Sequence, residues 1–210
     1  MQALQSTLFE QTLSYAMSAD VDVLTQIFEP QLNAVCWQRT VTPSMMAYIE
    51  QINQKGVEVA RSLPLDEIES TVSRLLPEGE GKGEFIADLV LLAEMLSCLF
   101  DNPDIGLRLK TLSQAMCPKF HVDKVVCRLV CSYSIAGTQW LDNEGIDRAK
   151  LGHASSSDDA LNCYVVNAEV GDVLLLKGDA WPNNEGAGVV HRSPAVAPDA
   201  RRLVLTLDLM

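Results

Sequence analysis

Two histidines and one aspartate are the residues of this sequence best suited to chemistry. His121 and Asp123 stand two positions apart in His121-Val-Asp123, and His191 follows much later, directly after Val189-Val190. Residues i and i+2 of a strand point to one face, so we expect the imidazole and carboxylate of the motif to converge. Two imidazoles and one carboxylate on one side of a metal leave the other positions open, as a non-haem Fe(II) site requires.

An arginine beyond the second histidine extends this pattern. Arg202 opens the final strand-like segment, Arg202-Leu-Val-Leu-Thr-Leu207. If Arg202 faces the site, alternation turns Val204 and Thr206 inward as well, and leaves an outer packing layer of Leu203, Leu205 and Leu207. A guanidinium holds a carboxylate in a bidentate fork. We therefore expect Arg202 to bind the far carboxylate of a dicarboxylic cosubstrate, with Arg201 as the near alternative.

A cysteine near the first histidine leaves a second metal chemistry open. Cys117 lies four residues before His121, and its thiolate could reach the same ion. Cys117, His121, Asp123 and His191 would then form a closed tetrahedral set suited to zinc, with no open position for oxygen. A histidine in an apolar strand is also often an ordinary core residue, so a protein without metal is the third reading.

Several further residues are candidates for the surroundings of the site. Arg128 and the Gly137-Thr-Gln-Trp140 turn are expected at the mouth of the β-barrel predicted below for residues 105–210, where Arg128 could contact a cofactor. Trp181 precedes a Gly-rich loop and could form a lid, so a substrate would enter past Trp140 and Trp181. His153 lies in a polar loop and is expected at the surface.

The second half of the chain must supply the scaffold. From Ile105 onward, short segments rich in β-branched and apolar residues are separated by Gly, Asn, Asp and Pro, which is typical of a sandwich or barrel. The expected strands cover residues 107–112, 125–135, 164–166, 173–176, 189–190 and 203–209. Residues 145–159 are polar and are expected to form a surface loop. We predict a mostly antiparallel barrel over residues 105–210.

The first half is predicted to be mainly helical. Leu4, Leu8 and Leu13, with Tyr15 and Met17, suggest an amphipathic opening helix, and residues 32–37 suggest a strand. The other expected helices cover residues 45–53 after the Thr42-Pro43 cap, residues 66–76 after an Asp66/Glu69 capping box, and residues 84–100. The prediction is an α+β chain, with helices of residues 1–104 packed on the outside of the barrel.

Composition narrows the possible partners and location. A net charge of −12 argues against nucleic acid and anionic membranes, which both require basic surfaces. The longest apolar segment, residues 85–100, contains Asp88 and Glu94 and is too short and too charged to span a bilayer. The N-terminal residues lack the pattern of a secretory signal, so we expect a cytoplasmic protein with reduced cysteines. Cys127 and Cys131 are expected on one face of a strand as small core residues.

The order of the motifs resembles a known superfamily. An H-x-D motif, a strand beginning at Gly171-Asp172, a distal histidine and then an arginine resemble the double-stranded β-helix of cupins and 2-oxoglutarate/Fe(II) oxygenases, over residues 105–210. The resemblance implies that His121, Asp123 and His191 are iron ligands and that Arg202 is the cosubstrate arginine.

The whole chain also resembles an uncharacterised bacterial domain-of-unknown-function family, of the 1826 type. That resemblance is carried by Cys117-Pro-Lys-Phe-His-Val-Asp123, Gly137-Thr-Gln-Trp140, Gly171-Asp-Val173 and His191-Arg-Ser-Pro194. Members are often encoded beside zinc-homeostasis genes, which implies a link to zinc supply.

Two functional hypotheses follow. The first is an Fe(II)/2-oxoglutarate-dependent oxygenase of unknown substrate. The second is a non-enzymatic zinc-binding protein linked to zinc homeostasis. An inward Arg202 beside an open metal position favours the first, and a metal-bound Cys117 favours the second.

Overall fold

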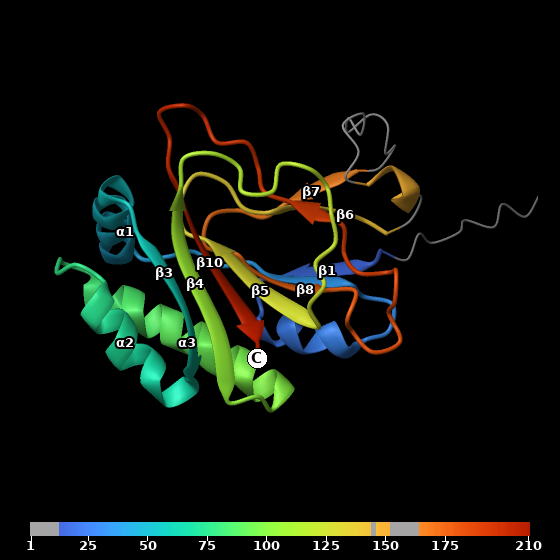
Figure 1. Cartoon of the computed structure of the whole chain (residues 1–210), viewed down its shortest axis with the longest axis horizontal. Helices are drawn as coiled ribbons and strands as arrows, with labels where there is room; N and C mark the ends of the chain where they lie inside the picture. Colours follow the sequence, from blue (N-terminus) through green and yellow to red (C-terminus); the bar gives the residue numbers. More distant parts are fainter. Residues whose placement is uncertain (1–12, 144–145, 152–163) are drawn as a thin grey trace, which may run out of the picture.

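A seven-stranded sheet forms the main body of the chain. The structure is a computed structural model that describes residues 13–143, 146–151 and 164–210. The strands lie in the order β1-β2-β8-β5-β10-β4-β3 (Figure 1). Their bounds in that order are Tyr15–Ser18, Ala34–Trp37, Val173–Lys177, Cys127–Ser132, Arg202–Leu209, Asp104–Leu112 and Glu58–Pro64. The β1–β2 pair is parallel and the other five pairs are antiparallel.

A second, small sheet faces one end of the large one. It consists of β7 (Val165–Asn167), β6 (Gln139–Leu141) and β9 (His191–Arg192), all antiparallel. Trp140 and Val166 of the small sheet pack in one apolar cluster with residues of β2, β8, β5 and β10. The prediction of a mostly antiparallel arrangement over residues 105–210 is therefore confirmed for the described residues.

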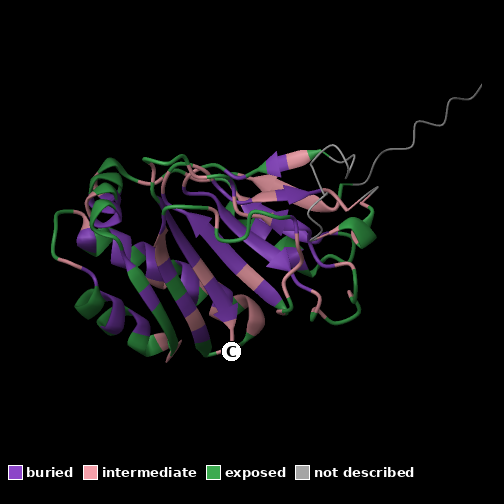
Figure 2. Ribbon diagram, turned by 45° about the horizontal axis from the view of Figure 1, so that its top comes forward, coloured by how far each residue is buried: buried purple, intermediate pink, exposed green. Residues whose placement is uncertain are grey.

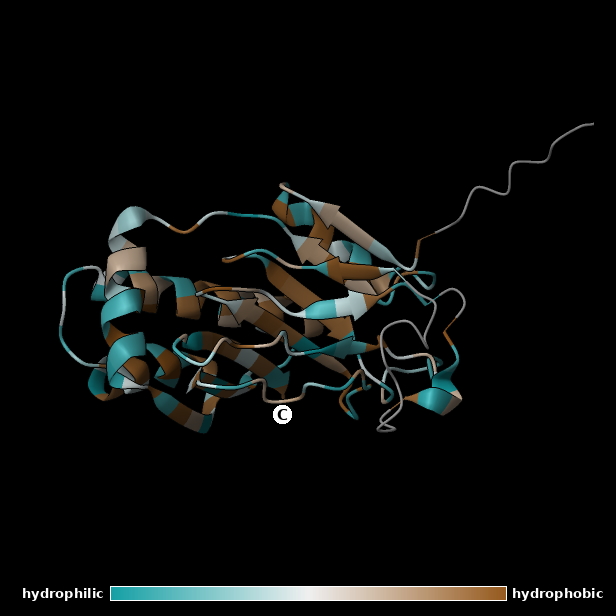
Figure 3. Cartoon of the chain, turned by 90° about the horizontal axis from the view of Figure 1, so that it is seen from above, coloured by the Kyte–Doolittle hydropathy of each residue, from teal (hydrophilic) through white to brown (hydrophobic). Residues whose placement is uncertain are grey.

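Helices cover the other face of the large sheet (Figure 1). They are α1 (Pro43–Lys55), α2 (Ile68–Leu75) and α3 (Lys82–Phe100), with 3-10 turns η1 (Val21–Phe28) and η2 (Leu65–Glu67), while η3 (Arg148–Lys150) lies in the 146–151 segment. Figure 3 shows hydrophobic residues concentrated on the strands and hydrophilic ones on loops and outer helix faces. None of the helices in the described ranges is both long and apolar enough to cross a membrane.

Alternation along the strands divides the interior into two cores. Leu203, Leu205 and Leu207 of β10 face the helices, as predicted, and Cys127 and Cys131 of β5 lie in the same cluster. Figure 2 shows the central strands buried and the edge strand β3 largely exposed. The residues of β10 between these leucines face the opposite side, toward the small sheet, so the polar site can lie there without interrupting the main core.

A buried ion pair joins α3 to this core. Asp88, the charged residue inside the apolar segment 85–100, pairs with Arg39 and accepts a hydrogen bond of 2.6 Å from Tyr133. Burial of a carboxylate requires such partners, because an unpaired charge in the interior is costly. The pair explains why α3 can be apolar nearly all round and still contain an aspartate.

The prediction for the first half needs three corrections. Residues 1–12 lie outside the described residues, but Tyr15 and Met17, assigned to a helix, belong to β1, because pairing with β2 overrides the local pattern. Strand β3 was not predicted at all. Residues 1–104 thus contribute three strands to the large sheet as well as the helices, and strands from both sides of residue 104 pair with each other.

Two smaller expectations also differ from the structure. The segment after Pro64 begins with η2, so Asp66 and Glu69 form no capping box and Ile68–Leu75 has no side-chain cap. By contrast, Thr42 caps α1 as predicted. The expected polar loop of residues 145–159 and its His153 lie largely outside the described residues.

Candidate metal centre

A short backbone bridge brings the two histidines together. His121 and His191 form an isolated antiparallel bridge, with N–H···O distances of 3.0 and 2.9 Å between their backbones. Directly opposed residues of an antiparallel pair carry their side chains on the same side, and the two ring centroids are 4.5 Å apart. The expected convergence occurs, but its cause differs from the predicted one, since Asp123 follows the bridge in irregular backbone and not in a strand.

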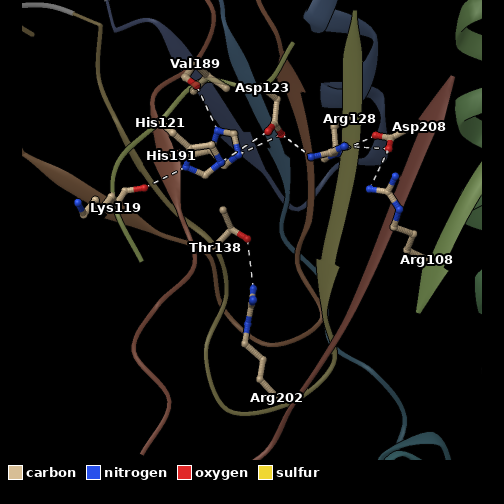
Figure 4. A network of polar contacts seen from close by, with 10 residues as sticks. All are labelled: Arg108, Lys119, His121, Asp123, Arg128, Thr138, Val189, His191, Arg202 and Asp208. Carbon is tan, nitrogen blue, oxygen red and sulfur yellow. Dashed lines mark hydrogen bonds and ion pairs between the residues drawn. The ribbon is translucent and has the colours of Figure 1, made fainter. Parts of the chain in front are cut away.

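Both imidazoles are held in the form that a metal ligand needs. The Nδ1 atom of His121 lies 3.0 Å from the Lys119 carbonyl oxygen, and that of His191 lies 3.2 Å from the Val189 carbonyl oxygen (Figure 4). A carbonyl oxygen only accepts, so Nδ1 carries the proton and Nε2 keeps its lone pair. Both Nε2 atoms then face Asp123.

Asp123 completes the group. Its Oδ1 lies 3.5 Å from Nε2 of His121 and its Oδ2 lies 3.3 Å from Nε2 of His191. Two ligands bound at about 2.1 Å in neighbouring positions of an ion are about 3 Å apart, so the observed spacing fits one small divalent metal. Together the three ligand atoms form the one cluster of metal-binding type in the described ranges.

The electrostatics of the site keep this carboxylate ionised. Burial alone would raise the pKa of Asp123. In the metal-free protein, hydrogen bonds from the protonated forms of His121 and His191 and the charge of Arg128 instead hold that pKa well below its usual range. Conversely, the hydrogen bond to Asp123 raises the pKa of His121. The candidate ligands are therefore one carboxylate that stays ionised and two imidazoles.

Arg128 is engaged by carboxylates of the protein. Its Nη1 donates to Asp123 at 2.6 Å, and its Nε and Nη2 donate to the two oxygens of Asp208 at 2.7 and 2.8 Å. Arg108 lies on the other side of Asp208, at 3.8 Å (Figure 4). Arg128 therefore orients Asp123, and its expected contact with a cofactor stays a prediction. We missed this pairing, although alternation along β10 places Asp208 on the face of Arg202.

Arg202 lies in the same cavity and has a different environment. Its side chain is 2% exposed, donates 2.9 Å from Nε to the Ala136 carbonyl and contacts the hydroxyls of Ser132 and Thr138. In the described part of the chain, no carboxylate forms an ion pair with it, neither Asp123 nor Asp208. Burial lowers its pKa to about 10.

The cavity joins these groups. A space of about 80 Å³ is lined by the three candidate ligands, Arg202 and Thr138, and by the apolar side chain of Val204. Thr206 lines it too, as the predicted alternation of β10 requires. Arg201 is exposed and is not part of the lining, so Arg202 is the better placed of the two arginines.

Three other candidates are placed differently from expectation. Cys117 is exposed and lines the cavity, but its thiol does not belong to the described three-residue cluster. Trp140 is fully buried between the two sheets. Trp181 packs against Phe28 and Phe100 on the helix side. Neither tryptophan lines the cavity, so the expected entry past them is wrong.

Comparison with solved structures defines the class of fold. A dioxygenase for auxin oxidation from rice matches with 15% identity and a TM-score of 0.51, covering 85% of this chain and 74% of its own. A dioxygenase for auxin oxidation from Arabidopsis thaliana, solved with 2-oxoglutarate, matches with 11% identity and a TM-score of 0.51, covering 95% and 92%. At such identities the likeness is one of fold alone: the chain shares the fold of these two dioxygenases.

The sequence itself places the chain more narrowly. The model of the DUF1826 family, described as a protein of unknown function, matches residues 18–208. The chain therefore belongs to the DUF1826 family, as the sequence resemblance predicted. No curated protein matches the sequence significantly.

Proposed function

We propose that this protein is a non-haem Fe(II) oxygenase that uses 2-oxoglutarate as cosubstrate. The observation that carries the proposal is Arg202, a cation buried in the same cavity as the His121, Asp123 and His191 group without a carboxylate partner among the described residues. Burying an unpaired charge is costly unless an anion neutralises it. A ligand carboxylate supplies that anion.

Each residue has a definite task in this proposal. His121, Asp123 and His191 would hold the ion by one face, and Nδ1–H donation to backbone carbonyls fixes their rings for it. Arg128 holds Asp123 ionised and oriented. Arg202, with the hydroxyls of Ser132 and Thr138 beside it, would bind the far carboxylate of 2-oxoglutarate. When bound, the ion would supply dioxygen activation, with 2-oxoglutarate as co-reductant.

The zinc-binding alternative has no comparable support. A closed zinc site needs a fourth protein ligand, and the Cys117 thiol is not a member of the described cluster. The two solved neighbours described above are dioxygenases, and one was solved with 2-oxoglutarate. These features favour the open site over the closed one.

Metal and cosubstrate binding test the proposal directly. Protein purified without oxygen is loaded with Fe(II), and bound metal and 2-oxoglutarate are measured together. We expect one Fe(II) per chain, 2-oxoglutarate binding that requires the metal, and slow release of CO₂ from 2-oxoglutarate in air. Asp123→Asn removes the anionic ligand and should abolish all three. Failure of the metal-loaded wild type to bind 2-oxoglutarate would refute the proposal.

A further inference from the structure

A second cavity adjoins the metal cavity over β3 and β4. It has a volume of about 350 Å³ and includes Glu58 and Ala60 of β3, and Arg108 and Lys110 of β4. Four residues line both cavities: Met116, Arg128, Val204 and Thr206. A molecule in the second cavity, named here the β3–β4 groove, would therefore extend toward the metal ligands.

The groove is open because the small sheet covers only part of the large one. The cluster that joins the two sheets contains residues of β2, β8, β5 and β10, a single residue of β4, Leu112, and none of β3. Figure 1 shows β3 and β4 at the edge of the large sheet away from β6 and β7. Among the described residues, the small sheet thus leaves the face over β3 and β4 uncovered.

Register places the charged side chains of the groove side by side. Lys110 pairs with both Glu58 and Val204, and Arg108 pairs with both Ala60 and Thr206. Directly opposed residues share a face, so Arg108 and Lys110 project from the face that also contains Val204 and Thr206. The floor between them is formed by small and apolar residues.

Arg108 is the cation of the groove with spare donors. Its side chain is 61% exposed, and its one ion pair in the described ranges is 3.8 Å long, to Asp208. Both oxygens of Asp208 already accept shorter bonds from Arg128, at 2.7 and 2.8 Å. Lys110, in contrast, is paired with Glu58 at 2.6 Å. The guanidinium of Arg108 can therefore accept an anion without giving up a strong contact.

The local charge also favours an anion. The side chains that line the site and groove include five cations, Arg108, Lys110, Arg128, Arg192 and Arg202, and two carboxylates, Glu58 and Asp123. Asp208, which pairs with Arg128, adds a third carboxylate beside them. The whole chain has a net charge of −12. A cationic recess on an acidic protein concentrates field lines and selects ligands by the sign of their charge.

We propose that the β3–β4 groove binds the substrate and that the substrate is an organic acid. Its acidic group pairs with Arg108, its carbon skeleton lies over Ala60, Val204 and Met116, and its other end reaches the metal site. This inference rests on the proposed function, since it assigns a substrate class to the same site.

Ligand-observed NMR with a series of ω-phenylalkanoic acids and the corresponding amides tests it. The pairs differ only in charge, and binding is measured with saturating 2-oxoglutarate and Mn(II), which broadens protons near the metal. We expect the acids to bind at least tenfold tighter than the amides, with their phenyl protons broadened. Arg108→Met should remove that preference. Glu58→Gln should tighten acid binding several-fold, because it frees Lys110.

Arg61→Met is the matched control, because Arg61 is an exposed arginine that alternates to the other face of β3. It should leave acid binding unchanged. The proposal is overturned if no acid binds, if amides bind as well, or if Arg108→Met and Arg61→Met behave alike. Measurements on metal-free protein separate the two proposals. If acids bind there in a way that depends on Arg108, but the metal-loaded protein binds no 2-oxoglutarate, only the proposed function is refuted. Arg202-dependent 2-oxoglutarate binding without acid preference would remove this one alone.

Discussion

Replacing Arg202 with methionine should weaken 2-oxoglutarate binding and leave the free energy of unfolding of the ligand-free protein nearly unchanged. Methionine keeps much of the apolar volume and removes the charge. The three hydrogen bonds that Arg202 makes contribute about 1 kcal/mol each. Against this, burial lowers the pKa of Arg202 to about 10. This shift means that burial destabilises the charged form of Arg202 by about 3 kcal/mol. The two effects nearly cancel, so we expect the ligand-free variant to unfold within about 1 kcal/mol of the wild type.

The effect on ligand binding is expected to be large. At 2-oxoglutarate concentrations about 100 times Kd, the metal-loaded wild type gains about 2.7 kcal/mol of stability. A charge-assisted pair contributes about 1.5–3 kcal/mol, so Arg202→Met should weaken binding about 10- to 150-fold. At the same concentration, the gain in the variant falls to between about 0.3 and 1.4 kcal/mol.

Urea unfolding with and without 2-oxoglutarate measures both quantities. Arg201→Met is the control, because Arg201 is the adjacent arginine and is exposed; it should retain the full ligand-induced gain. If Arg202→Met destabilises the ligand-free protein by more than about 3 kcal/mol, Arg202 is a structural cation. If 2-oxoglutarate stabilises wild type and Arg202→Met equally, the anchor lies elsewhere and the reasoning fails.

Three further predictions concern the metal ligands. Arg128→Met should weaken metal binding about 10- to 100-fold in a titration, because Arg128 orients and ionises Asp123; unchanged affinity would show that the contact is incidental. Asp123 raises the pKa of His121, so in the metal-free protein their contact stabilises the fold when His121 is protonated. This stabilisation is complete at pH values below the pKa of His121 in the unfolded chain. It is lost as the pH rises through the pKa of His121 in the folded protein. Asp123→Asn should therefore cost more stability at about pH 5 than at about pH 8 in chemical unfolding, and an equal cost at both would contradict it. Cys117→Ser should leave metal affinity unchanged, and a tenfold loss would revive the four-ligand zinc site.

The sequence was sufficient to predict the parts of the site that depend on residue type and alternation. The two histidines and Asp123 were identifiable because few side chains bind metals and they follow a characteristic order. The alternation of β10 correctly placed Arg202 on one face and the leucines on the other. What the sequence could not show was the backbone bridge between His121 and His191, which depends on a pairing across 70 positions.

The missed elements depend on long-range pairing. In β3, only Val59 is fully buried, so the segment lacks the alternating burial that marks a strand, and its identity comes from pairing with β4. The role of Arg128 depends on the β5–β10 register, which places it directly opposite Asp208. Neither register is encoded in local propensity.

The His121–His191 bridge has a consequence for the stability of the fold. An ion held by both imidazoles would join two points 70 positions apart, and it can bind only when the fold has brought them together. Because the ion leaves the unfolded chain, it stabilises the fold by mass action, by about 2.7 kcal/mol at a free metal concentration 100 times Kd. The segment between these residues contains β5, β6, β7 and β8. Metal binding and the folding of this central part of the large sheet are thus coupled, so that loss of the ion weakens the fold as well as the chemistry.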